Sequence, residues 1–238
     1  MDEKSMQFAN FNITFGENDA PMLKHFSDII FPAFSGDYIR GKRDSVPRYF
    51  FAGVEIKEVD NEYVMVGNFI KETQYKVVTT VQEGVLASTP ADVPTAPYSR
   101  FIVFLKNHRM VLVRNETASP DTRSFQSTVR DILNQYVRNA NRERSERDKL
   151  PIAIANIVDI PLKDSIADVL KNVNKVSWFK LRFFPLNNDL DPGPLTQHIR
   201  EDMKKVGSKT TNIVFNSPNS KDGISKMIAE SSGLAVAS

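Results

Sequence analysis

Apolar and polar residues alternate in the first part of the chain as they do in β-strands. In residues 8–15, every second position from Ala9 to Phe15 is apolar, and this period of two places these side chains on one face of a sheet. Residues 48–81 are rich in Val, Ile, Phe, Tyr and Thr, which predicts two or three further antiparallel strands. The N-terminal half is therefore expected to contain an antiparallel sheet.

Helical spacing interrupts this strand pattern twice in the N-terminal half. Apolar residues recur at helical intervals from Leu23 onwards, and Asp19 is expected to cap a helix that ends near Gly36. A second helix is predicted to open at residues 119–121, because apolar positions from Phe125 onwards follow the i, i+4, i+7 spacing of one buried face.

Residues 88–113 are predicted to form a loop followed by a tight hairpin. Three prolines lie among small residues between positions 88 and 97, a composition typical of loops. Two apolar runs, residues 101–105 and 110–113, then flank a polar segment in which an Asn-His pair is expected to turn the chain. Both runs are expected to be buried on at least one face.

Predicted strands and helices alternate in the C-terminal part. Strands are expected at residues 152–160, 176–184 and 210–215, and helices at residues 164–173, 195–206 and 222–231. The final residues resemble the beginning of a strand, so we expect the chain to be truncated there. These patterns predict an α+β protein with an N-terminal α+β subdomain, residues 1–150, and a C-terminal strand/helix subdomain, residues 151–238.

The composition narrows the chemistry that the chain can perform. It has no cysteine, so disulfides, thiolate metal sites and cysteine nucleophiles are excluded. The N-terminus lacks the pattern of a signal peptide, and no stretch reaches the roughly 18 apolar residues of a membrane span, so a cytoplasmic protein is expected. With 31 basic and 29 acidic side chains, nucleic-acid binding would require a local basic patch.

One weak pattern suggests an enzyme. Glu55 and Lys57 are two positions apart on a predicted strand and Asp44 lies upstream, and metal-dependent nucleases use acidic residues with a lysine in this way to hold Mg²⁺ and activate water. Neither a second acidic ligand nor any phosphate-binding glycine loop or Gly-x-Ser-x-Gly motif accompanies them. A solvated strand face is the competing interpretation, and no cofactor is expected unless the nuclease hypothesis holds.

Basic residues with an aromatic neighbour give the stronger functional hypothesis. Alternation along residues 176–184 places Trp178, Lys180 and Arg182 on one strand face, where an aromatic ring flanked by cations can stack a base and contact phosphates. The alternative is a tryptophan covered by a helix with two basic side chains reaching outward. A second basic cluster lies after the first predicted helix and comprises Arg40, Lys42, Arg43 and Arg48.

Three segments carry a resemblance to known proteins: residues 48–54, residues 101–113 and residues 176–184. They resemble an uncharacterised bacterial family that is distantly similar in layout to the lambdoid phage exclusion protein RexA, which is similar in fold to the DNA-binding protein RdgC. The resemblance extends over about residues 8–231 and consists of hydrophobic strand patterns. It implies a dimeric α+β protein that binds DNA without sequence preference in phage defence or genome maintenance.

The leading hypothesis is thus a non-enzymatic nucleic-acid-binding or sensing protein, with DNA as a candidate partner. Two alternatives stay open, a metal-dependent nuclease and a protein-interaction subunit that forms a homo-oligomer or joins a defence or toxin complex.

Overall fold

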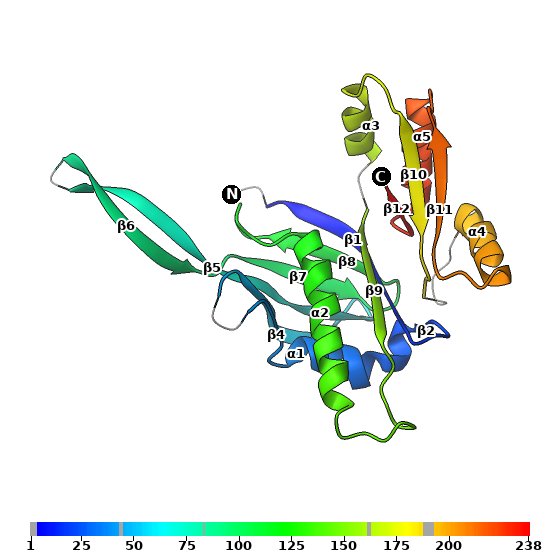
Figure 1. The fold of residues 1–238 in the computed structure, drawn as a ribbon, viewed down its shortest axis with the longest axis horizontal. Coiled ribbons are helices and arrows are strands. Elements are labelled where there is room, and N and C mark those ends of the chain that lie inside the picture. Colours follow the sequence, from blue (N-terminus) through cyan, green and yellow to red (C-terminus); the bar gives the residue numbers. More distant parts are fainter. Residues whose placement is uncertain (1–3, 43–44, 83, 161–162, 188–192) are drawn as a thin grey trace.

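A computed structural model describes residues 4–42, 45–82, 84–160, 163–187 and 193–238, and it confirms the predicted α+β fold (Figure 1). The first of its two antiparallel sheets has the strand order β9-β1-β8-β7-β5-β4-β3, with β2 beside the end of β1 and β6 paired with β5. The strands of this sheet are β1 (Met6–Phe15), β2 (Ala20–Pro21), β3 (Ile39–Arg40), β4 (Arg48–Val59), β5 (Glu62–Gln82), β6 (Val85–Thr95), β7 (Tyr98–Phe104), β8 (Arg109–Arg114) and β9 (Ala153–Asp159).

Helix α2 (Thr122–Ala140) packs across one face of this sheet and provides the centre of the main core. Phe125 is fully buried, and its ring lies 5.2 Å from the rings of Phe51 and Phe69 and 5.4 Å from that of Phe101, measured between centroids. Asp121 begins the helix, because its Oδ1 accepts a hydrogen bond from the backbone nitrogen of Ser124 at 2.8 Å. The helix predicted to open at residues 119–121 is therefore confirmed.

The first predicted helix is present but begins differently. It consists of a 3₁₀ turn η1 (Met22–His25), a π-helical segment η2 (Phe26–Ile30) and a short α1 (Phe31–Ser35). Asp19 does not cap it: this residue has φ = 50°, and Pro21 stands at the cap position without a side-chain hydrogen bond. The expected cap was wrong because β2 separates Asp19 from the first turn.

The prediction of a loop at residues 88–97 was also wrong, because most of this segment belongs to β6. The strand forms a two-stranded ribbon with the distal half of β5, and this ribbon projects from the body of the molecule (Figure 1). Proline is tolerated in an edge strand because no further strand needs its missing N–H. A shift in register between Val77 and Thr79 accommodates one extra residue in β6.

Strands and helices alternate in the C-terminal part as predicted. Strand β9 pairs with β1 over seven residue pairs and so belongs to the first sheet, beyond the subdomain boundary expected near residue 150. The second sheet has the order β11-β10-β12. The remaining elements are α3 (Lys163–Lys171), β10 (Trp178–Phe183), α4 (Gly193–Lys205), β11 (Thr211–Asn216), α5 (Lys221–Ser231) and β12 (Ala235–Ala237).

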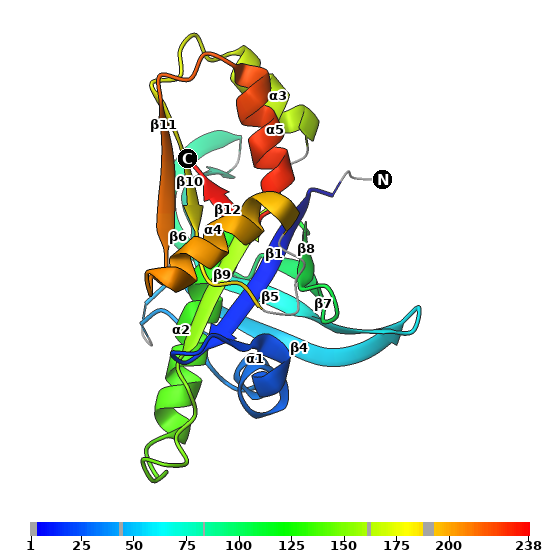
Figure 2. The same ribbon diagram turned by 90° about the vertical axis from the view of Figure 1, so that its right-hand side faces the viewer.

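The three C-terminal helices cover one face of the second sheet. Phe179, Leu181 and Phe183 of β10 are buried there against Met203 of α4 and Ile224 of α5. Figure 2 shows α5 on one side of β10 and β11, with the other side of these strands uncovered. In the described part of the chain, none of the helices has the length and apolar character needed to cross a membrane.

A buried polar joint connects the two sheets. Asn12 of β1 donates a hydrogen bond from Nδ2 to the carbonyl of Pro185 and accepts one at Oδ1 from the backbone nitrogen of Asn187, both at 2.8 Å. The Asn187 side chain in turn accepts from the backbone nitrogen of Met22 at 2.8 Å and donates to Nδ1 of His108 at 3.2 Å. Asn12, Asn187 and His108 are fully buried, so these bonds form away from water.

We expect Asn12→Ala to lower the free energy of unfolding by about 2 to 4 kcal/mol, because it leaves a buried N–H and a buried carbonyl without their partner. Urea denaturation measures the change. Asn134→Ala, at an exposed position on α2, is the matched control and should change stability by less than about 0.5 kcal/mol. Equal stabilities for the Asn12 variant and the wild type would contradict this account of the joint.

Candidate nucleic-acid interface

The uncovered face of the second sheet carries the aromatic and basic residues that the alternation of β10 predicted. Trp178 is 51% exposed and shares this face with Lys180 and the exposed Arg182. The Lys180 Nζ lies 5.5 Å from the centre of the Trp178 ring, a cation–π arrangement. The alternative of a tryptophan covered by a helix is thus wrong, because the helices lie on the opposite face.

Neighbouring strands extend this open face with uncharged side chains. Asn216, Val214 and Asn212 of β11 lie opposite Trp178, Lys180 and Arg182 in the strand register. Val214 is half exposed, and Val236 of β12, which lies beside Arg182, is 40% exposed. None of the side chains in these pairs is acidic, so no carboxylate within this set of pairs neutralises the two cations.

Helix α2 brings further arginines to the edge of this face. Arg123 and Arg130 are seven positions apart and are both exposed. Nε of Arg130 donates a hydrogen bond to the carbonyl of Ala155 on β9 at 2.8 Å, which fixes the guanidinium beside the second sheet. Burial lowers the pKa of Arg130, and the nearby positive charge of Arg182 lowers it further. Two guanidinium groups on different elements therefore converge.

A groove runs between α2 and β9 on one side and the second sheet on the other. One cavity in it has a volume of about 410 Å³ and is lined by Arg130, Arg182 and Lys209, with no acidic residue in its lining. A second cavity, also about 410 Å³, shares Gln126, Val158 and Val236 with the first and adds Arg123 and a single acid, Asp159. We call these two cavities together the basic groove.

Lys209 stands at the rim of the basic groove and is already paired. Its Nζ lies 3.0 Å from Oδ1 of Asp19 and also contacts the carbonyl of Glu17. The charge of Lys209 is therefore partly neutralised by a carboxylate. For Arg182, the described residues provide no carboxylate within ion-pair distance.

In the second predicted basic cluster, Arg40 and Arg48 make contacts within the fold, and neither lines the basic groove. Nε of Arg40 donates to Oγ1 of Thr128 at 2.8 Å, and its guanidinium carbon lies 4.0 Å from the centre of the Tyr49 ring. Arg48 forms an ion pair with Glu72 at 2.7 Å. Lys42 is exposed, and Arg43 lies outside the described residues.

The residues of the nuclease hypothesis do not gather into a metal site within the described ranges. Glu55 and Lys57 pair with each other on β4, with Nζ and Oε2 3.2 Å apart, and both are more than half exposed. Asp44 lies outside the described residues. Among the residues that are described, no three His, Asp or Glu side chains form a group that could hold a metal ion.

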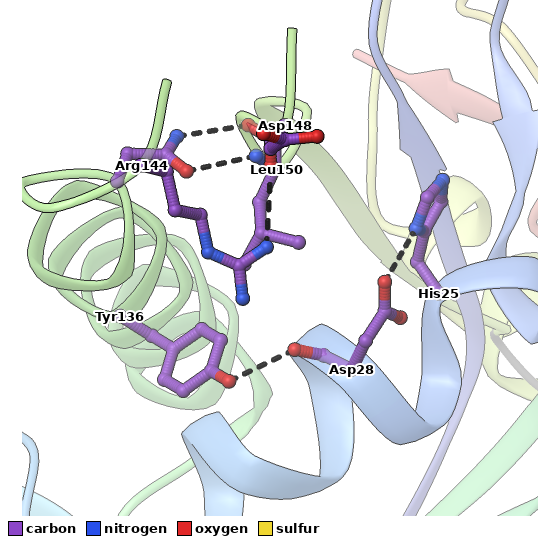
Figure 3. A network of polar contacts seen from close by, with 7 residues as sticks. His25, Asp28, Tyr136, Arg144, Asp148 and Leu150 are labelled. Carbon is purple, nitrogen blue, oxygen red and sulfur yellow. Dashed lines mark hydrogen bonds and ion pairs between the residues drawn. The ribbon is translucent and has the colours of Figure 1, made fainter. Parts of the chain in front are cut away.

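The far end of α2 carries a polar network that is structural (Figure 3). The hydroxyl of Tyr136 donates to the carbonyl of Asp28 at 2.9 Å, and the Asp28 carboxylate lies 3.1 Å from Nδ1 of His25. Arg144, from the basic run after this helix, donates to the carbonyl of Asp148 at 3.2 Å. These contacts tie α2 to the helical segment η2 and close the loop that leads to β9.

Sequence reasoning missed Arg123 and Arg130 as members of this site. A signal for the two arginines was present: they lie seven positions apart on the polar face of an amphipathic helix whose apolar face had been recognised. No pattern in the sequence shows that α2 and β10 line the same groove.

Comparisons with known proteins add no family to this geometry. No protein-family model, no curated protein and no solved structure matches the chain.

Proposed function

We propose that this protein binds nucleic acid in the basic groove and on the adjoining open face of the second sheet, with a preference for single strands. The observation that carries the proposal is the convergence of Arg130 and Arg182 at one end of the strand face whose other end carries the half-exposed Trp178. The protein acts in this proposal as a binding or sensing component of the cytoplasm. The resemblance noted above suggests a role in phage defence or genome maintenance.

Phosphate is the ligand that best fits the groove. Two guanidinium groups that face each other without an acid between them repel, and an anion placed between them removes this repulsion. Each guanidinium also presents several N–H donors in a planar fork that matches phosphate oxygens. Arg123, Arg130 and Arg182 extend over both cavities of the groove, so a linear polyanion fits this set better than an isolated phosphate.

Trp178 favours single strands over duplexes. Base stacking on an aromatic side chain requires a base whose face is free, which a duplex does not offer away from its ends. The open face around Trp178 includes the exposed amides of Asn212 and Asn216, which can donate to and accept from base edges without restricting the sequence.

Arg182→Glu is expected to weaken binding of a single-stranded oligonucleotide at least about tenfold at roughly 50 mM salt, because it reverses a charge at the centre of the groove. Fluorescence anisotropy measures the affinity. For the wild type, the slope of log K against log salt should be about −3, since four cations, Arg123, Arg130, Lys180 and Arg182, each contribute roughly −0.7 for single strands.

Lys226→Glu is the matched control for this charge reversal. Lys226 lies on α5, on the helix-covered side of the second sheet, and is 77% exposed. We expect it to leave the affinity within about twofold of the wild type. Equal losses for both variants would show that only overall charge matters, and no measurable binding by the wild type at low salt would overturn the proposal.

Trp178→Ala should weaken single-strand binding by roughly 1 to 3 kcal/mol, the usual contribution of one stacked base, and should leave duplex binding almost unchanged. Trp178→Phe should retain most of the affinity. Because the chain has one tryptophan, quenching of intrinsic fluorescence on adding a single strand reports on this residue alone. Tight binding without any change in tryptophan emission would show that the base does not stack there.

A further inference from the structure

The ribbon formed by residues 73–82 of β5 and 85–95 of β6 carries exposed apolar side chains on both faces, but charged pairs on only one; we call it the arm, and its charge-free side the apolar face. In its register, Tyr75 lies opposite Val93 and Val77 opposite Ala91, so these side chains share a face with Val81. Tyr75, Val81 and Val93 are 65%, 68% and 47% exposed. On the other face Lys76 lies opposite Asp92, and the exposed Val78 and Val85 lie there as well, so what distinguishes the apolar face is that its described pairs carry no charge.

In the described structure, no other part of the same chain packs against the arm. Strand β6 pairs with β5 alone among the described strands, and the arm points away from the rest of the molecule (Figure 1). A two-stranded ribbon is marginally stable in water by itself, and contiguous exposed apolar side chains indicate an interaction surface. Pro94 has no N–H to offer a further strand, so the arm is suited to packing through its face.

A complementary apolar surface lies on the first sheet, on the face opposite α2. Phe8, Val111, Ile102 and Val66 are successive partners across β1, β8, β7 and β5, and Phe8 is 43% exposed. A hollow of about 430 Å³ opens there, lined by Phe8, Phe104, Val111 and neighbours that include no acidic residue. We call this surface the rear face.

The rear face is also only partly covered. The joint with the C-terminal part protects the region of Asn10 and Asn12, which lies beside the rear face on β1. Strands β7 and β8 are apolar in nearly continuous runs, a pattern typical of strands that are buried on both faces. Helix α2 accounts for one of these faces, and the rear face lacks an equivalent layer.

We propose that the arm of one copy packs its apolar face against the rear face of a second copy, and that two such contacts related by two-fold symmetry form a dimer. Both halves of the contact are on the same chain, so two copies satisfy each other and the assembly closes. The exposed parts of the arm residues offer on the order of 300 Å² per arm. Two arms and the two surfaces they cover then bury on the order of 1,200 Å², which reaches the range of specific interfaces.

Light scattering coupled to size exclusion tests the assembly first. The wild type is expected to elute as a dimer at micromolar concentration, and Tyr75→Glu as a monomer, because a charge on the apolar face of the arm would be buried in the contact. Val169→Glu is the matched control, since Val169 is 66% exposed on α3, outside both surfaces, and this variant should remain a dimer. A monomeric wild type, or dimers of equal stability for all three proteins, overturns the proposal.

Cross-linking tests which surfaces meet, and the absence of cysteine from the chain removes any background. The double variant Tyr75→Cys with Phe8→Cys should form covalent dimers with a short bis-maleimide, whereas each single variant and the pair Tyr75→Cys with Val169→Cys should not. Efficient cross-linking of Tyr75→Cys alone would show that the arms pack on each other, which overturns the assignment of the rear face. This readout does not depend on nucleic-acid binding.

Discussion

The position of the second sheet depends on Asn12, a polar residue within strand β1. The backbone of Asn12 pairs with β9, and its side-chain amide forms two further hydrogen bonds, to Pro185 and Asn187. A buried amide is stabilising only when its donor and acceptor are both satisfied, so this contact tolerates one placement of the segment that follows β10. Asn187 then links the same segment to Met22 of η1 and to His108 in the turn between β7 and β8, so three separate parts of the N-terminal half hold it.

The basic groove is a consequence of this placement. Arg182 belongs to the strand that leads into the joint, and Arg130 is held to the edge strand β9 by the carbonyl of Ala155. Arg130 is positioned by its bond to Ala155 and Arg182 by its place on β10, and the two charges lie near each other because α2 and β10 line the same groove. The repulsion between them lowers the pKa of Arg130 in addition to the effect of burial.

The elements of this fold could largely be predicted from the sequence, whereas their arrangement could not. The alternation at β1 and β10 and the helical spacing of α2 follow from local periodicity, which the chain displays directly. The sequence predictions were wrong where contacts with distant parts of the chain determine the local structure. The prolines of β6 are compatible with an edge strand only because nothing pairs beyond it, and Asp19 lost its capping role because β2 pairs with β1 before the helix begins.

In the candidate site, too, the residues of one element could be grouped from the sequence, whereas the contribution of a distant element could not be predicted. Trp178, Lys180 and Arg182 share a face because they lie on one strand, so a period of two was sufficient to group them. Arg130 joins them from a helix 52 positions away from Arg182 in the sequence, and no local pattern connects the two. The reverse holds for Arg40 and Arg48, which are close in sequence but are held by Thr128 and Glu72. A nearly balanced net charge is therefore compatible with a basic groove, because Asp159 is the single acidic residue in the lining of its two cavities, and other acids such as Glu72 and Glu55 pair with cations elsewhere.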